Sequence, residues 1–295
     1  MAESIAFVGF GEAGQTIGRG LLAQGARLRA YDLLFDDPAN QGRLRRTAEE
    51  MGVAVARHHA EAVEGAGLVF LAVTAGSSLV AARSCLPGLR AGQLFLDINS
   101  VSPQRKIDTA ALIAPTAAAY VDVAVMAPVA PYDHKVPCLI GGPGAEALLP
   151  RARALGMKME RVSAEVGQAS AIKMFRSIMI KGLEALFVES MLAASEYKVE
   201  ERVLASLKET FPSLDWEKLA GYMIERVVSH GKRRAAEMRE VAETLSGIGL
   251  EPIMAAATAA RQQWVADLGV KEQLAGRKTE NRAELIAAIR EAIGK

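Results

Sequence analysis

Residues 8 to 14 of this 295-residue chain read Val8-Gly9-Phe10-Gly11-Glu12-Ala13-Gly14. The stretch follows the apolar run 4–8, which predicts a buried strand. It precedes residues 12–24, whose apolar spacing predicts a helix that ends before Gly25. A turn with the spacing Gly-x-Gly-x-x-Gly between the first strand and the first helix is the arrangement that holds the pyrophosphate of a dinucleotide. These seven residues therefore predict a nucleotide-binding βα unit.

Each glycine of this turn has a distinct expected role. Gly9 allows the tight turn, Gly11 lets the backbone approach a pyrophosphate, and Gly14 lets helix and strand pack closely. The start of the helix adds free N–H groups and a partial positive charge for the phosphates. The alternatives are glycines that only close a turn, or a different adenine nucleotide. The agreement of strand, glycines and helix favours dinucleotide binding.

An acidic residue at the next strand end bears on the choice of cofactor. Asp32 ends the second predicted strand, where a carboxylate can bond the ribose 2′-hydroxyl. The same carboxylate would repel a 2′-phosphate, and Leu33 and Leu34 supply no cation. The sequence therefore favours NAD. NADP stays open, because the arginines at 43, 45 and 46 could fold back towards that position.

The first half of the chain alternates short apolar runs with helical segments. Strands are expected at 4–8, 27–31, 53–56, 68–73, 93–98, 120–125, 139–142 and 158–162, and helices at 12–24, 40–51, 77–84 and 145–155. Short strands that are apolar throughout predict a parallel sheet covered on both faces. The expected fold class is therefore α/β, with a doubly wound sheet.

From residue 163 onward the sequence predicts helices only. The first is a long helix within 165–198, a stretch without proline, and others are expected at 200–210, 215–229, 232–246, 252–268 and 279–293. Gly231 is expected to separate two of them. We therefore expect a dinucleotide-binding domain at 1–162 and an all-helical domain for substrate binding and dimerisation at 163–295, joined by the long helix.

Composition argues against several classes of function. Hydrophobic residues make up 51% of the chain, and a net charge of +1 gives no electrostatic case for nucleic acid or an anionic membrane. Cys85 and Cys138 do not make a disulfide scaffold, and no Cys, His or carboxylate spacing predicts a metal site. Prolines interrupt the apolar stretch 110–131, which argues against a membrane span. Because no targeting signal is recognised, a cytoplasmic location is expected.

Two further motifs follow predicted strands. Residues 97–103 read DINSVSP, and residues 167–173 read GQASAIK at the start of the long helix. In this order, after the glycine-rich turn, they resemble the motifs of the β-hydroxyacid dehydrogenase superfamily, which includes 3-hydroxyisobutyrate and 6-phosphogluconate dehydrogenases. The resemblance covers nearly the whole chain, and is greatest to a divergent bacterial 6-phosphogluconate dehydrogenase-like subgroup. It implies a Rossmann domain followed by an all-α domain, a nicotinamide cofactor, and Lys173 as the catalytic lysine.

Three departures from the family pattern leave the substrate open. Ser177 stands where the family usually has Asn, four residues after the lysine. Residues 122–128 (DVAVMAP) lack the family's Ser-Gly-Gly turn, and residues 232–234 (KRR) replace a Lys-Asp pair near the nicotinamide. The expected fold and cofactor survive these changes, whereas the identity of the substrate does not follow from the resemblance.

One face of the long helix is polar. The polar residues of this face are Ser170, Lys173, Ser177, Lys181 and Glu184. At about 100° per residue, they fall within an arc of roughly 80° around the helix. Because the rest of the helix is apolar nearly all round, we expect it to be buried, with this stripe facing a cleft. The alternatives are a solvated stripe, or a surface pair between Lys181 and Glu184.

The chemistry expected at this stripe is proton transfer. Hydride transfer from an alcohol carbon to a nicotinamide needs a base for the hydroxyl proton. We hypothesise that Lys173 is this base, and the acid in reduction, with Ser177 orienting the substrate hydroxyl. The expected substrate is a small anionic β-hydroxy acid, including phosphorylated and sugar acids. Its expected contacts are Asn99, Ser100, Asp122, Arg176 and Arg234, with Asp122 open between a pocket residue and a buried strand-end acid, and His134 a weaker candidate.

The expected cofactor contacts combine the glycine-rich turn with three strand ends: Gly9, Phe10, Gly11, Glu12, Ala13, Gly14, Asp32, Val73, Thr74 and Asn99. Two other functions stay open. An imine or ketone reductase is one, although such relatives usually carry Asp or Tyr at the position of Lys173. A non-catalytic NAD-binding sensor is the other, although an inert protein gains nothing from burying a lysine. A homodimer is expected, because a second copy related by twofold symmetry can pack on the long helix.

Overall fold

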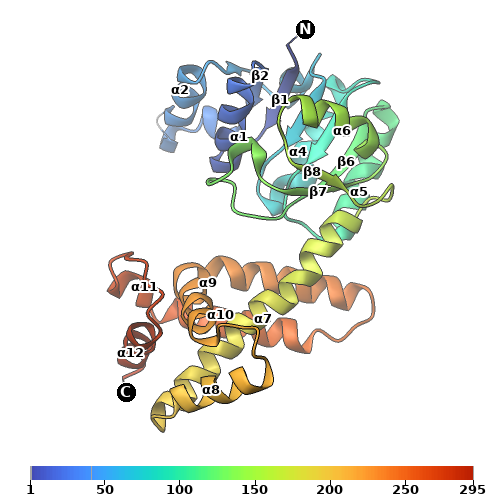
Figure 1. The fold of residues 1–295 in the computed structure, drawn as a ribbon. Coiled ribbons are helices and arrows are strands. Elements are labelled where there is room, and N and C mark those ends of the chain that lie inside the picture. Colours follow the sequence, from blue (N-terminus) through green and yellow to red (C-terminus); the bar gives the residue numbers. More distant parts are fainter. Residues whose placement is uncertain (1, 41, 295) are drawn as a thin grey trace. The chain divides into compact units, whose positions relative to one another are not determined.

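The chain divides into two compact units, Met1–Lys173 and Met174–Lys295. The structure is a computed structural model that describes residues 2–40 and 42–294. The division falls inside the long helix α7 (Gln168–Glu196), whose first turns belong to the first unit (Figure 1). The first unit is an α/β domain and the second is all-α, which confirms the fold class expected from the sequence.

The first unit is built on one eight-stranded sheet with the order β3-β2-β1-β4-β5-β6-β7-β8. The strands are β1 (Ser4–Val8), β2 (Arg27–Tyr31), β3 (Ala54–Val55), β4 (Leu68–Leu71), β5 (Leu94–Asp97), β6 (Ala119–Val125), β7 (Cys138–Gly141) and β8 (Met159–Arg161). The strand order reverses between β1 and β4, so the carboxyl ends of these two strands form the crevice where doubly wound sheets bind ligands.

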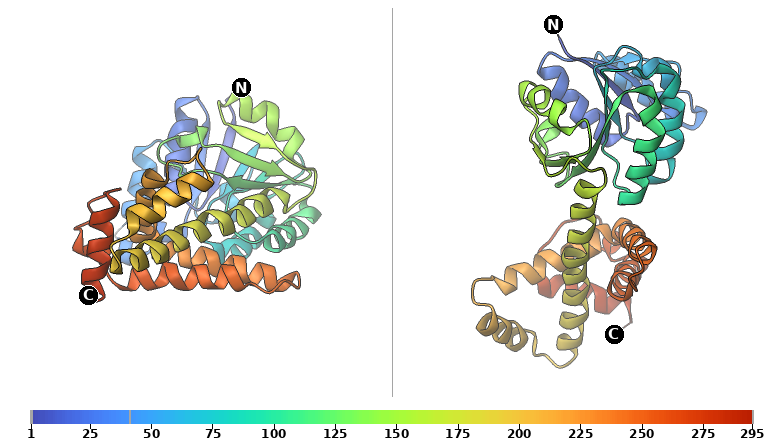
Figure 2. Two further views of the ribbon diagram at one scale, coloured as in Figure 1. Left: turned by 60° about the horizontal axis from the view of Figure 1, so that its bottom comes forward. Right: turned by 90° about the vertical axis from the view of Figure 1, so that its right-hand side faces the viewer.

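Helices cover both faces of this sheet (Figures 1 and 2). They are α1 (Glu12–Ala23), α2 (Arg43–Glu50), α3 (His59–Val63), α4 (Ser78–Cys85), α5 (Pro103–Ile113) and α6 (Ala145–Ala154). Alternate residues of β1 enter different cores: Phe7 packs in the cluster with α1, α2 and α6, and Val8 in the cluster with α3, α4 and α5. The strands are apolar on both faces because both faces are covered.

Three features of the first unit differ from the sequence-based expectation, and one of them is the short helix α3, which was not predicted. The strand β7 pairs antiparallel with β6, whereas a purely parallel sheet was predicted. The connection after β6, residues 126–137, contains no crossover α-helix and returns the chain beside that strand, a path typical of antiparallel pairing. Helix α5 was not predicted, although Ser102 caps it by accepting a hydrogen bond from the Arg105 amide, and Pro103 occupies its first position.

The second unit contains the rest of α7 and five further helices. They are α8 (Glu200–Thr210), α9 (Trp216–Gly247), α10 (Ile253–Asp267), α11 (Val270–Gln273) and α12 (Arg282–Ala292). Its core gathers Val188 and Met191 of α7 against Ile224 of α9 and Ile289 of α12. Within the described ranges, no helix is both long enough and apolar enough to cross a membrane.

The predicted break at Gly231 is wrong. Helix α9 continues through this residue for 32 residues in all, and a Cβ at position 231 would lie 2.6 Å from the carbonyl oxygen of Gln262 in α10. The glycine therefore serves the close packing of two helices. A glycine inside a helix costs conformational entropy, and tertiary packing outweighs that cost here.

The expectation that α7 is buried nearly all round is also wrong. Ile172, Phe175, Met179 and Leu186 are between 37% and 65% exposed. Their spacing of three, four and seven residues places them on one side of the helix. The helix is thus amphipathic in an unusual sense, because its exposed side is apolar and part of its buried side is charged.

Candidate functional site

The glycine-rich turn after β1 is fixed by close backbone contacts. Gly9 has φ +90°, and a Cβ there would lie 2.4 Å from the carbonyl oxygen of Ala72. A Cβ at Gly14 would lie 2.8 Å from the carbonyl oxygen of Gly9, which brings α1 tightly onto the strand end. Both positions therefore exclude any side chain, as the sequence motif requires.

The start of α1 has the form of an anion site. Gly11 is the N-cap of the helix and supplies no side-chain cap, and the space where its Cβ would stand holds no other atom within 4 Å among the described residues. The first N–H groups of any α-helix lack an intrahelical acceptor, and the helix dipole places positive charge there. Glu12, Ala13 and Gly14 thus present backbone donors where a pyrophosphate could lie against Gly11.

Asp32 links the glycine-rich turn to the end of β2. Its Oδ2 accepts a hydrogen bond from the Phe10 amide at 2.7 Å, and its Oδ1 accepts one from the Leu34 amide at 2.9 Å. The half-buried carboxylate keeps further lone pairs for a ribose hydroxyl. Arg45, one of the arginines that could have reached it, pairs with Asp36 at 2.6 Å and lies over the Phe35 ring.

Asn99 joins the carboxyl ends of β4 and β5. Its Oδ1 accepts a hydrogen bond from the Val73 amide at 2.9 Å, and its Nδ2 donates to Asp97 Oδ1 at 2.8 Å. Val73 and Asn99, predicted as separate cofactor contacts, are therefore brought into direct contact. The neighbouring Thr74 and Ser100 are exposed at the same edge, where the carboxyl ends of parallel strands meet.

A buried charge cluster lies directly beneath this edge. Lys106, Asp97 and Asp122 have no exposed surface, and Lys106 Nζ lies 3.2 Å from Asp97 Oδ1 and 3.5 Å from Asp122 Oδ1. The Tyr120 hydroxyl donates to Asp97 Oδ2 at 2.8 Å. Burial raises the pKa of Tyr120 well above its ordinary value, and the charge of Asp97 acts in the same direction.

Sequence reasoning missed Lys106. The available signal was its helical spacing to Thr109 and Ile113, both of which are buried on the sheet side of α5. A lysine on a buried face needs a partner, and Asp97 is the acid at the end of the preceding predicted strand. Because the sequence analysis did not predict helix α5, the helical spacing around Lys106 was not recognised.

Asp122 holds the start of α7. Its Oδ2 accepts hydrogen bonds from the amides of Gly167 and Ser170, each at 3.1 Å, and its Oδ1 accepts one from the Ser170 hydroxyl at 2.5 Å. A carboxylate at a helix N-terminus satisfies free donors and complements the helix dipole. Of the two roles left open from the sequence, the structure favours a buried acid, although Asp122 lies in the middle of β6 and not at its end.

Lys173 lies one helical turn after Ser170 in α7 and is half-buried. Its charge is close enough to the Cys138 thiol of β7 to oppose the effect of burial, which raises the pKa of Cys138 to about 12. The residue therefore lies near the start of β7, where Cys138 pairs with Val125 at the carboxyl end of β6. Further along the same helix, Ser177 is half-buried and Arg176 is exposed.

Arg234 is not free to bind a substrate anion, contrary to the sequence-based prediction. Its Nη1 lies 2.6 and 2.8 Å from the two carboxylate oxygens of Glu184, and Gln262 also donates to that carboxylate at 3.0 Å. Lys181 pairs with Glu237 of α9 at 2.6 Å. The alternative of a Lys181–Glu184 surface pair is therefore wrong as well, because each residue has its partner on α9.

His134 is likewise not placed for substrate contact. Its side chain is only 6% exposed and packs on Gly20 of α1, where a Cβ would overlap the imidazole. Burial lowers the pKa of His134, with the charge of Lys135 acting in the same direction. The residue holds the loop after β6 against α1.

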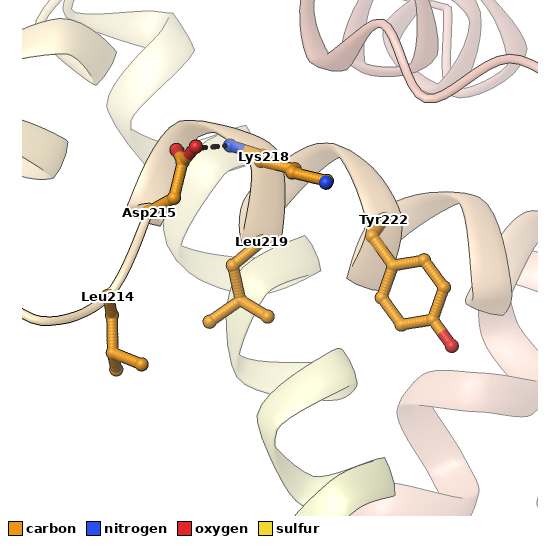
Figure 3. A pocket seen from close by; sticks show the side chains of 5 residues that line it. All are labelled: Leu214, Asp215, Lys218, Leu219 and Tyr222. Carbon is orange, nitrogen blue, oxygen red and sulfur yellow. Dashed lines mark hydrogen bonds between the residues drawn. The ribbon is translucent and has the colours of Figure 1, made fainter.

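Two hollows in the second unit contain no predicted site residue. One, of about 200 Å³, is lined by Leu214, Asp215, Lys218, Leu219 and Tyr222 (Figure 3). Its one drawn hydrogen bond is the N-cap of α9, in which Asp215 accepts from the Lys218 amide. The other, of about 600 Å³, lies between α9 and α10. Among the described residues, no group of three or more His, Cys, Asp or Glu side chains could hold a metal ion.

Protein-family models match a part of each unit. Residues 4–100 match the family described as NADP oxidoreductase, coenzyme F420-dependent. Residues 194–265 match a domain of unknown function, DUF1932. The first match covers the glycine-rich turn, Asp32 and Asn99, so the nucleotide-binding features lie in a segment with oxidoreductase relatives.

Three solved structures share the whole fold. A conserved hypothetical protein from Sinorhizobium meliloti is 40% identical with a TM-score of 0.84, and the match covers 99% of this chain and 97% of that one. The conserved protein MTH1747, of unknown function and described as structurally similar to 3-hydroxyacid dehydrogenases, is 29% identical with a TM-score of 0.77 over 90% and 97% of the chains. The 3-hydroxyisobutyrate dehydrogenase of Mycobacterium tuberculosis is 18% identical with a TM-score of 0.70 over 99% of both chains, which shows a shared fold.

Proposed function

The chain belongs to the β-hydroxyacid dehydrogenase-like superfamily, and from this premise we propose that it transfers hydride between NAD and a small β-hydroxy acid. The oxidoreductase relatives and the glycine-rich turn support a nicotinamide cofactor. One observation carries the proposal. The anion site at α1, the Asn99 bridge and the start of the helix that bears Lys173 all belong to the carboxyl-end edge of one sheet.

The preference for NAD is argued from Asp32. A carboxylate that already accepts two backbone hydrogen bonds is held at the ribose position, where it can accept a further bond from a 2′-hydroxyl. A 2′-phosphate at that position would meet a like charge. The pairing of Arg45 with Asp36 removes one of the cations that could have compensated.

Lys173 is the proposed general base in oxidation and general acid in reduction. The nicotinamide supplies the hydride acceptor when bound, and the protein supplies the proton acceptor. A lysine can serve as the base only where its surroundings favour loss of the ammonium proton, and Lys173 is half-buried. Ser177, one turn further along the helix, is proposed to orient the substrate hydroxyl.

The proposed substrate is a small anion. Of the two arginines suggested by the sequence, only the exposed Arg176 retains a role in holding its carboxylate or phosphate, because Arg234 is paired with Glu184. The exposed Ser100 and the neighbouring Asn99 are the proposed partners at the sheet edge. This arrangement serves an acid better than an uncharged ketone or imine.

The test is an activity screen of the purified protein with NAD or NADP and a panel of hydroxy acids, aldonates and their phosphates. Formation of reduced nicotinamide with one of them is expected, at a higher kcat/KM with NAD. Lys173→Ala should then lower kcat/KM by roughly 10²- to 10⁴-fold, the usual contribution of general acid–base catalysis. The matched control is Lys158→Ala, because Lys158 is an exposed lysine of the same unit.

Two results would overturn the proposal. One is near-normal turnover by a folded Lys173→Ala variant, which would remove the lysine from the mechanism. The other is tight binding of reduced cofactor without turnover of any acid. In that case, a screen of imines and ketones would separate a reductase from a non-catalytic sensor.

A homodimer is part of the proposal. The apolar side of α7 that is exposed in the single chain includes Phe175, Met179 and Leu186. A row of large apolar side chains on one helix face is suited to pairing with the same row in a second copy.

A further inference from the structure

The cluster of Lys106, Asp97 and Asp122 is the most deeply buried set of charged groups among the described residues. All three side chains have no exposed surface. Lys106 Nζ donates to the backbone oxygen of Asp97 at 2.5 Å and lies within 3.5 Å of one carboxylate oxygen of each aspartate. These three acceptors match the three donors of an ammonium group.

We propose that Lys106 is a positioning residue, which joins the strand ends that hold Asn99 to the helix start that carries Lys173. The role of Lys106 in catalysis rests on the proposed dehydrogenase function. Its role in holding the strand ends and the start of α7 together does not. Because Lys106 has no exposed surface, it touches neither cofactor nor substrate and acts only through its neighbours.

The first arm of the cluster runs through Asp97. Asp97 Oδ1 accepts hydrogen bonds from both the backbone amide and the Nδ2 of Asn99, at 3.0 and 2.8 Å. Asn99 in turn holds the Val73 amide at the end of β4. The orientation of the Asn99 carboxamide, and with it the shape of the cofactor edge, thus depends on where the Asp97 carboxylate is held.

The second arm runs through Asp122. This carboxylate receives two amides and one hydroxyl from the first turn of α7, as described above. Gly167, just before that turn, packs within 3.3 Å of Pro103 at the start of α5, measured from the position of its missing Cβ. Helix α5, which carries Lys106, therefore also lies against the start of α7 (Figure 1).

Stability alone is a poor reason for this arrangement. Taking charges out of water is costly, and apolar replacements of buried ion clusters are often neutral or stabilising. Such clusters are better suited to fixing one arrangement among several, because each charge restricts where its partners can lie. Here the restricted partners are the two carboxylates that orient Asn99 and the α7 helix start.

The test replaces the ammonium by an apolar side chain of similar length, in Lys106→Met. The affinity for NADH, followed by its fluorescence, should fall by about tenfold. Amide hydrogen exchange at Val73, Gly167 and Ser170 should become at least tenfold faster, and kcat should fall more than the substrate KM changes. Lys158→Met, at an exposed position of the same unit, should leave all three quantities unchanged.

A second variant covers the case in which the first does not fold, because Lys106→Met leaves two buried carboxylates without a cation. The double variant with Asp97→Asn removes one of those charges and keeps an acceptor for the Asn99 amide. Its melting temperature should return to near the wild-type value. Amide hydrogen exchange at Gly167 and Ser170 should stay fast in this double variant, because no cation then joins the side chains at positions 97 and 122.

The outcomes separate this inference from the proposed function. Wild-type NADH affinity and wild-type amide exchange in either folded variant would overturn the positioning role. If the natural protein turns over no substrate or binds no nicotinamide, the dehydrogenase proposal fails. The exchange rates at Val73, Gly167 and Ser170 would still decide whether Lys106 joins the two arms.

Discussion

Two arginines suggested by the sequence for one task lie in opposite environments. Arg176 is exposed on α7, whereas Arg234 is only 8% exposed and paired with Glu184. Burial raises the pKa of Glu184 and lowers the pKa of Arg234, so for both groups desolvation outweighs the attraction of the partner. A pair of this kind is costly to break, because the remaining charge stays buried.

The two arginines should therefore respond differently to substitution. Arg234→Met should lower the free energy of unfolding by about 3–5 kcal/mol, because it leaves Glu184 without its cation. Arg176→Gln should change stability by less than about 0.5 kcal/mol, as for other exposed positions. It should raise the substrate KM roughly tenfold or more at unchanged kcat, as expected for loss of a charge-assisted hydrogen bond.

Urea unfolding and steady-state kinetics on both variants check this prediction. The wild type at the same pH and salt concentration is the reference, because an exposed anion contact weakens with ionic strength. An Arg176→Gln enzyme with an unchanged KM would remove Arg176 from the substrate site. A fully stable Arg234→Met variant would show that the Glu184 pair contributes nothing to the fold.

At the residue scale, the sequence predicted the groups that belong to a local motif. Gly9, Gly14 and Asp32 act through neighbours a few residues away or on the adjacent strand, so their spacing is enough. Lys106 and Asp122 could not be assigned in the same way. Their partners come from separate strands and helices, and the spacing that marks Lys106 as buried can be used only once α5 is known to be a helix.

The helices show how packing can override a local signal. Gly231 is a helix breaker by propensity, yet it lies inside α9 because α10 passes directly against it. The sequence did predict that helices flank this position, since the apolar spacing on either side is helical. It could not show that they are one helix, because that depends on the carbonyl of Gln262, 31 positions further along the chain.

A matched pair of glycine substitutions in α9 tests this explanation. Gly231→Ala should destabilise the protein by about 1–3 kcal/mol, because its Cβ would meet the Gln262 carbonyl and force the helices apart. Gly247→Ala, at the last residue of the same helix, meets no other atom within 4 Å among the described residues. It should be neutral or stabilising by up to about 1 kcal/mol.

Thermal or urea unfolding of the two variants, followed by circular dichroism, gives both free energies under identical conditions. Equal effects at the two positions would contradict the packing explanation, because only at position 231 would the added Cβ meet another helix. A stabilised Gly231→Ala variant would mean that α9 and α10 are further apart than the structure has them.

The antiparallel strand β7 illustrates the limit of the strand pattern. Its apolar residues predicted a strand in the right place, because burial sets that pattern. The direction of pairing depends on the path of the loop after β6, which His134 fixes by packing on α1. Nothing in the strand itself carries that information, so a parallel partner was the default expectation in an α/β sequence.

The whole molecule exposes a row of apolar residues that a single chain leaves in water. Phe175, Met179 and Leu186 lie on one side of α7 and are 37%, 65% and 54% exposed. We therefore expect light scattering to give twice the 31.4 kDa mass of one chain. Met179→Glu should shift the protein towards the monomer, because it places a charge in the middle of an apolar contact. The control is Met254→Glu, since Met254 is 57% exposed on α10 and should leave the mass unchanged. A wild-type monomer at micromolar concentration, or equal masses for the two variants, would show that this side of α7 does not pair with a second copy.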